Sequence, residues 1–311
     1  MILQIIVDEY AAFRKTLGER FRTNGQVLAA FCRAMGQDAN LADVTSDKVS
    51  VFLAGKGPLT ASWHVRHNAL LGFYRYAISR GFVTVSPLPL VKPKRPPAFQ
   101  PYIYSQAELQ RLLDATASYQ RNRSRIDPLM IRALILLMYG AAIRTSEALS
   151  LTIVDVDLAG SVLTVRDSKF FKTRLVPLGP KTVQVLAEHA TLRGSKELAD
   201  PFFAARDGKR VNISTLENVF QRIRSHAGLH RDGGVRCQPR LHDLRHTSAV
   251  HRLTTWYREG KDVQKLLPQL SVYLGHTHLA ATQVYLTMTP ELLHEASRRF
   301  ESYAAPEGHY D

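Results

Sequence analysis

Hydrophobic residues recur at helical spacing along much of the chain. In its first third, two such sets are present: Val27, Leu28, Phe31 and Met35, and then Leu70, Leu71, Tyr74 and Ile78. Spacings of three and four residues place apolar side chains on one side of an α-helix. Gly18 and Gly81 predict helix ends. The first third therefore predicts a helical domain.

A proline-rich segment interrupts this pattern between residues 87 and 101. Proline has no backbone N–H group and disfavours helix interiors and central strands, so the segment SPLPLVKPKRPPAFQP predicts an extended linker. We expect a domain boundary here, with a helical domain over residues 1–97 and a second domain over residues 102–311.

The second domain begins with Ser105 and Glu108, whose spacing is that of a capping box. A buried helix is expected from about Leu129 to Ala142. The period then changes to short apolar runs that predict three strands, at Ile153–Val156, Val162–Val165 and Leu175–Pro177, with turns at Gly160 and at residues 169–172. Helical spacing returns over residues 181–192, 214–226, 242–257 and 290–302. We therefore expect a mainly α fold with a small antiparallel β-sheet.

The net charge of the sequence indicates the kind of partner that the protein binds. The 41 basic and 27 acidic residues give a formal charge of +14, and residues 1–97 are about twice as basic per residue as the rest. Such an excess favours a polyanionic partner, with nucleic acid first. A membrane protein is not expected, because no apolar run approaches the ~18 residues that span a bilayer and the N-terminus lacks signal-peptide features. Two cysteines fit a reducing cytoplasmic setting at the nucleoid.

The segment LHDLRHTSAV carries the first candidate chemistry. His242 and Arg245 are three residues apart in a helical stretch and project from one face. An imidazole beside a guanidinium that can bind two phosphate oxygens suits phosphoryl transfer. His242 and His246 could instead bind zinc, although no third ligand is evident and the glutamate of an HExxH site is missing.

Two further segments carry candidate residues with open alternatives. Arg144 follows a buried helix, and Glu147 lies three residues later, so the two could form a structural ion pair and nothing more. Tyr285 lies nine residues after His276 among apolar residues, where a core aromatic is an alternative to a nucleophile.

Taken together, the order and spacing of these segments resemble the tyrosine recombinase, or phage integrase, family. The segments are AAIRTSEAL, DSKFFKTRLVPLG, HDLRH, LGH and TQVYL. The resemblance covers the whole second domain and assigns catalytic positions to Arg144, Lys169, His242, Arg245, His276 and Tyr285. Thr145 stands where an aliphatic residue is common, and Phe170 and Phe171 replace small turn residues. The first domain resembles, more loosely, the helical core-binding domain of Xer-type and phage integrases.

The resemblance implies a mechanism. Arg144 and Arg245 would clamp the non-bridging oxygens of a DNA phosphodiester, and His242 and His276 would donate hydrogen bonds or move protons. Lys169 would protonate the leaving 5′ oxygen. Tyr285 would attack and leave a 3′-phosphotyrosine and a free 5′ hydroxyl. We expect no metal, nucleotide or other cofactor, since the sequence has no GxxxxGK[ST] loop and no carboxylate cluster suited to magnesium.

Other basic residues are candidate contacts to the DNA backbone: Lys92, Lys94, Arg95, Lys172 and Arg174. The first three could also form a solvated linker surface. Lys172 is a second possibility for the catalytic lysine, but counting back from the VPL strand favours Lys169.

The expected partner is double-stranded DNA with paired recombination half-sites, bound by a homotetramer that is a monomer in solution. The family's C-terminal tail packs on a neighbouring protomer, and here residues 290–302 predict an amphipathic helix that begins at Pro290. That helix could also pack on its own domain. A type IB topoisomerase and a DNA-binding regulator that lost activity are the alternative functions, and no catalytic residue is missing as the second would require.

Overall fold

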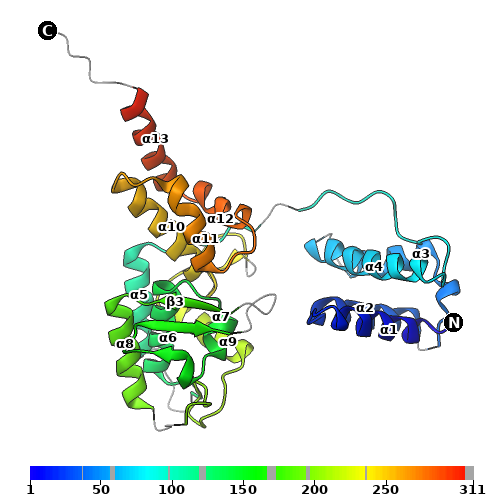
Figure 1. Ribbon diagram of the computed structural model, residues 1–311, viewed down its shortest axis with the longest axis horizontal. Coiled ribbons are helices and arrows are strands. Elements are labelled where there is room, and N and C mark those ends of the chain that lie inside the picture. The colour runs from blue at the N-terminus through cyan, green and yellow to red at the C-terminus, as the bar shows by residue number, and fades with distance from the viewer. Residues whose placement is uncertain are drawn as a thin grey trace. The chain divides into compact units, whose positions relative to one another are not determined.

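The computed structural model describes residues 1–36, 38–56, 60–96, 99–118, 124–166, 173–193, 197–234 and 237–304. Residues 302–304 are described by their backbone only. The chain forms two compact units, Met1–Ala98 and Phe99–Asp311 (Figure 1). Lys169 and Lys172 lie outside the described residues. No helix within the described ranges is both long and apolar enough to cross a membrane.

The first unit is helical. Its helices are α1 (Leu3–Thr16), α2 (Arg22–Met35), α3 (Ser46–Ala54) and α4 (Ala61–Ser79), with a 3-10 turn at Leu41–Asp43. Leu28, Phe31 and Leu70 lie in its core, as their spacing predicts. Gly18 and Gly81 follow α1 and α4 with φ of +80° and +73°, a conformation that glycine adopts without strain. The helix ends predicted at both glycines are confirmed.

The second unit combines helices with a small sheet. Its helices are α5 (Gln106–Ser118), α6 (Pro128–Gly140), α7 (Thr145–Ser150), α8 (Pro180–Leu192), α9 (Ile213–His226), α10 (Asp243–Arg258), α11 (Val263–Leu274), α12 (Ala280–Gln283) and α13 (Pro290–Ala304). The sheet is antiparallel in the order β1 (Val156–Asp157), β2 (Val162–Val165), β3 (Arg174–Pro177), with Val165 opposite Arg174. The prediction of a mainly α fold with a small antiparallel sheet is confirmed.

The strand predicted at Ile153–Val156 is wrong over most of its length. Residues Ile153–Asp155 form a 3-10 turn, and β1 begins only at Val156. The Asp155 carboxylate accepts hydrogen bonds from the amide and hydroxyl of Thr152, at 3.0 and 2.6 Å. These local bonds close a turn in a segment whose apolar residues otherwise favour a strand.

Side-chain caps define the helix starts that position the site. Ser105 and Glu108 form the predicted capping box, since the Ser105 amide donates to the Glu108 carboxylate at 2.8 Å and the Glu108 amide donates to the Ser105 hydroxyl at 3.2 Å. At the start of α6, Asp127 accepts from the Leu129 amide at 2.9 Å. The helix ends at Gly140, two residues before the predicted end at Ala142.

Two separate hydrophobic clusters stabilise the second unit. The larger one joins α5, α6, α8, α9 and the sheet, and the smaller one joins α10, α11 and α13 (Figure 1). Ala148 of α7 belongs to the larger cluster, whereas Ala142, Leu274 and Tyr285 belong to the smaller one. Ala141 and Ile143, on either side of Ala142, also belong to the larger cluster, so the segment that leads to Arg144 contacts both clusters.

Candidate active site

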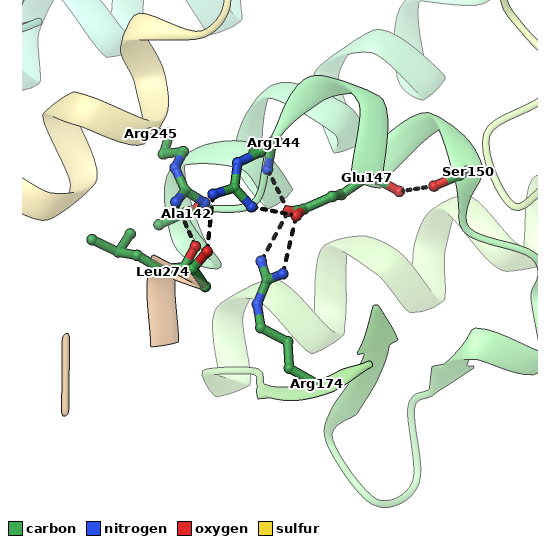
Figure 2. A network of polar contacts seen from close by, with 8 residues as sticks. Ala142, Arg144, Glu147, Ser150, Arg174, Arg245 and Leu274 are labelled. Atoms are coloured by element: carbon green, nitrogen blue, oxygen red, sulfur yellow. Dashed lines mark hydrogen bonds and ion pairs between the residues drawn. The ribbon is translucent and has the colours of Figure 1, made fainter. Parts of the chain in front are cut away.

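Arg245 is the most deeply buried cation of the site. It lies on α10, is 1% exposed, and donates from its two terminal nitrogens to the carbonyls of Ala142 and Leu274, at 2.5 Å each (Figure 2). Ala142 has a φ of +49°, which is unusual for a residue with a side chain. Burial, followed by the charge of Arg144, lowers the pKa of Arg245 to about 10. The guanidinium is thus held by neutral carbonyls beside a second cation.

Arg144 precedes α7 and is fixed by Glu147. The Arg144 amide and Nη1 donate to the two carboxylate oxygens at 2.9 and 2.7 Å, and Nη2 donates to the Gly275 carbonyl at 3.0 Å. Burial on its own would raise the pKa of Glu147, but hydrogen bonds from Arg174 and Arg144 lower it to about 2. Glu147 is therefore ionised at neutral pH and accepts hydrogen bonds from both arginines.

Arg174 enters the same network from β3. Its Nη1 and Nη2 donate to Oε1 and Oε2 of Glu147 at 3.0 and 2.8 Å, which is a two-pronged arrangement (Figure 2). Glu147 is therefore shared by two guanidinium groups that come from different elements.

Two histidines contact Tyr285, and a third contacts one of them. His246 Nδ1 lies 3.1 Å from the Tyr285 hydroxyl, and the His276 ring is stacked on the Tyr285 ring with centroids 6.1 Å apart. His276 Nδ1 lies 2.8 Å from the Thr282 hydroxyl, which fixes the ring. His242 contacts His246, with ring centroids 5.1 Å apart.

Burial keeps these histidines neutral near pH 7. It is the first cause that lowers the pKa of His246 to about 3 and that of His276 to about 4, and positive neighbours such as Arg245 add to both shifts. The pKa of His242 is lowered by the same two causes. Neutral imidazoles can accept a proton or a hydrogen bond, which imidazolium cannot.

Tyr285 is both a core residue and a member of the site. It is 2% exposed within the smaller hydrophobic cluster, so the core alternative describes its packing correctly. Burial raises the pKa of its hydroxyl, and the charge of Arg245 opposes that effect. A hydroxyl, a neutral imidazole and two guanidinium groups thus lie in one place, which suits attack on a phosphate ester.

Among the residues that the structure describes, no group of three or more His, Cys, Asp or Glu side chains is placed to hold a metal ion. In the pair His242 and His246, the two candidate zinc ligands, His246 has the Tyr285 ring beside it.

The model of the phage integrase family matches residues 103–291, which is most of the second unit. The chain belongs to the phage integrase family. It is 34% identical over 304 residues to the putative integrase/recombinase y4rB of Sinorhizobium fredii, covering 95% of this chain and 96% of that protein. It is 27% identical over 307 residues to tyrosine recombinase XerC of Pelobacter propionicus, covering 94% and 95%. This phage integrase family member is therefore a site-specific DNA recombinase.

Solved structures share its fold. A lambda integrase tetramer bound to a Holliday junction superposes with a TM-score of 0.68 at 19% identity, covering 92% of this chain and 77% of that chain. XerA recombinase superposes with a TM-score of 0.51 at 22% identity, covering 98% and 99%.

The structure brings five of the six predicted catalytic residues of this family member together: Arg144, His242, Arg245, His276 and Tyr285. Lys169 and the alternative Lys172 lie outside the described residues. Lys92, Lys94 and Arg95 are exposed in the first unit, and their role as DNA contacts stays a prediction. Arg174, also predicted as a backbone contact, directs its guanidinium to Glu147 with 11% of the side chain exposed.

For two residues of the site, the sequence did not indicate the contacts that the structure shows. His246 was considered only as a zinc ligand, although its spacing of four from His242 places both on one helical face. The second partner of Glu147 could not be foreseen, because Arg174 is 27 residues away in sequence.

Proposed function

We propose that this chain breaks and rejoins double-stranded DNA through a covalent 3′-phosphotyrosine at Tyr285. The observation that carries the proposal is the Tyr285 hydroxyl, 3.1 Å from a neutral imidazole and beside the Arg245 guanidinium. The residue roles below belong to this proposal.

Arg144 and Arg245 bind the two non-bridging oxygens of the scissile phosphate. Their positive charge offsets the negative charge that repels a nucleophile and that grows in the transition state. Arg245 suits this role because its partners are neutral carbonyls, so its charge is not cancelled by a bonded carboxylate.

Proton transfer accompanies the exchange of bonds. The Tyr285 oxygen attacks phosphorus as its proton passes to Nδ1 of His246, and the bond from phosphorus to the 5′ oxygen breaks. Lys169 gives its proton to that 5′ oxygen, while His242 and His276 hydrogen-bond to the phosphate. Ligation reverses each step, so the energy of the phosphodiester is kept in the phosphotyrosine.

Assembly on DNA forms the second part of the proposal. A lambda integrase structure is a tetramer on a Holliday junction, which supports paired half-sites held by four protomers. We assign DNA-backbone contacts to Lys92, Lys94 and Arg95, and protomer contacts to the exposed side of α13. Exchange of strands between two duplexes distinguishes this function from that of a type IB topoisomerase, which relaxes supercoils only.

Covalent trapping tests the proposal. On a duplex nicked next to the cleavage site, the wild type becomes attached to DNA because the released fragment diffuses away. Tyr285→Phe abolishes attachment, since only the nucleophilic oxygen is lost, and leaves DNA affinity within about threefold. Tyr139→Phe is the matched control, because its hydroxyl also bonds to a histidine, His251 at 3.0 Å, on the same α10. Equal trapping of the Tyr285→Phe chain would overturn the proposal.

A further inference from the structure

We propose that Arg174 is a positioning residue of the recombination reaction, which holds Glu147, and through it Arg144, against the turn that precedes His276. This inference rests on the function proposed above. It gives Arg174 a role that differs from a contact to the DNA backbone.

The first argument is the geometry of the pair. Both terminal nitrogens of Arg174 are used by Glu147, at 3.0 and 2.8 Å, while the same carboxylate accepts from the amide and Nη1 of Arg144. A two-pronged pair fixes orientation as well as distance. Arg174 therefore determines where the carboxylate lies, and the carboxylate determines where Arg144 lies (Figure 2).

The second argument is the close approach of Arg174 to Gly275. A β-carbon built on Gly275 would lie 2.8 Å from Cζ and 3.0 Å from Nε of Arg174. Gly275 also has a φ of +66° and offers its carbonyl to Arg144 at 3.0 Å. The guanidinium thus packs on the residue that directly precedes His276, and three segments distant in sequence meet at Arg174.

The third argument is burial. The side chains of Arg174 and Glu147 are only 11% and 6% exposed. Nε of Arg174 is also buried, without a hydrogen-bond partner among the described residues. A contact to the DNA backbone would normally keep its charged group in solvent until DNA arrives, and Lys92 and Lys94 of the first unit are exposed in this way.

A physical reason for the arrangement follows from charge. Glu147 carries one negative charge, and a carboxylate bonded to Arg144 alone would compete with the scissile phosphate for that guanidinium. With Arg174 bound to the same carboxylate, its charge is divided between two cations. Arg144 then keeps more of its positive field for the phosphate while its position remains fixed.

Single-turnover cleavage of the nicked duplex at saturating protein tests this role. We expect Arg174→Met, which keeps the length of the side chain, to slow covalent attachment by about 10- to 100-fold, because a small displacement of a catalytic group has an effect of that order. Arg174→Lys retains a positive charge but cannot form the two-pronged pair with Glu147. We therefore expect its rate of covalent attachment to lie between those of Arg174→Met and the wild type.

Arg166→Met is the matched control. Arg166 directly follows β2 and pairs with the Asp155 carboxylate at 2.5 Å, but its side chain is 58% exposed and this carboxylate lies outside the site described above. Its loss leaves the rate within about threefold of the wild type. If the wild type is trapped normally and Arg174→Met reacts at the same rate, the positioning role of Arg174 is wrong while the proposed function stands. If the wild type itself is not trapped, the proposed function is wrong.

Two measurements separate positioning from direct contact with DNA. The salt dependence of affinity should be unchanged in Arg174→Met, whereas loss of a phosphate contact would reduce the slope of log K against log salt by about 0.9. In a double-mutant cycle with Glu147→Gln, Arg174→Met should add little further slowing. A reduced slope together with multiplicative effects would establish Arg174 as a DNA contact and reject the positioning role.

Discussion

A tyrosine hydroxyl attacks a phosphate effectively only if its proton has an acceptor within hydrogen-bond reach. In the second unit, Nδ1 of His246 occupies that place, 3.1 Å from the Tyr285 oxygen. Its lowered pKa, about 3, keeps it unprotonated in the free protein. A bound phosphate would raise that pKa, because a nearby anion favours imidazolium. Proton transfer would thus become easier only when the substrate is present.

We predict that His246→Ala slows covalent trapping by about 100-fold while affinity for DNA stays within about threefold, since a general base contributes that much or more. Single-turnover rates and gel-shift titrations measure the two quantities. His251→Ala is the control, because His251 lies on α10 like His246 but bonds to the Tyr139 hydroxyl of α6, outside the site. If both alanine variants react at the wild-type rate, His246 has no part in the chemistry.

The candidate catalytic residues could be predicted where they lie within a recognisable sequence motif. Arg144, His242, Arg245, His276 and Tyr285 were named from the sequence, and the structure brings them together. Arg174 could not be assigned in this way, since a basic residue after a turn has the same pattern whether it meets DNA or a carboxylate. Only the folded chain shows Glu147 in front of it.

At the scale of elements, α13 has two different sides. Leu292 is fully buried in the same cluster as Tyr285, whereas Leu293 and Phe300 are 49% and 73% exposed. The alternative that the helix packs on its own domain therefore describes one side only. The other side presents apolar surface that a neighbouring protomer can cover.

We predict that the double change Leu293→Ser and Phe300→Ser leaves binding to one half-site unchanged and abolishes cooperative binding to paired half-sites. The exposed side chains are removed while Leu292 still anchors the helix. Gel shifts over a range of protein concentrations measure both. Val272→Ser on α11, 72% exposed, controls for the loss of exposed apolar surface, and cooperativity retained in the double variant would limit α13 to its own protomer.

Elements were predictable where the hydrophobic period is long and uninterrupted, as in α6, α9 and α10. Helices α3, α7, α11 and α12 were not predicted, and for two of them the physical reason is clear. Helix α11 contains Pro268 in its interior, a residue that removes a helical hydrogen bond and marks helix ends elsewhere. Helix α7 has six residues, fewer than two turns, so that no period can be recognised.

At the scale of the whole molecule, the two units differ in charge density. Residues 1–97 hold 13 of the 41 basic and 6 of the 27 acidic side chains. We predict that a chain of residues 99–311 still folds but binds a specific site about 100-fold or more weakly, with a smaller salt dependence, because fewer phosphates are neutralised. Circular dichroism and salt titrations of binding test this, and unchanged affinity would assign DNA binding to the second unit alone.

The stability of the second unit should fall as the pH decreases from about 6.5 to 4. Burial lowers the pKa of five histidines there: His189, His242, His246, His251 and His276. In this window the unfolded chain binds more protons than the folded chain, so the free energy of unfolding decreases with decreasing pH. Below about pH 4.5, Glu147 also lowers the free energy of unfolding as the pH falls. Its pKa in the folded chain is about 2, so the unfolded chain binds a proton at this position before the folded chain does.

Urea unfolding at several pH values measures this dependence. Trp63 and Trp256 are the two tryptophans of the chain, one in each unit, so a Trp63→Phe chain reports on the second unit through Trp256 fluorescence. A constant free energy of unfolding between pH 7 and 5 would contradict the lowered histidine pKa values.

The carbonyl partners of Arg245 have a thermodynamic consequence. Leu274 is the last residue of α11, where the helix dipole concentrates partial negative charge, and together with Ala142 it holds the cation without supplying a full counter-charge. The folded chain therefore holds, beside Arg144, a positive charge that no bonded carboxylate offsets. Since an anion that binds only the folded state shifts the folding equilibrium, we predict that inorganic phosphate or sulfate raises the apparent melting temperature of this protein.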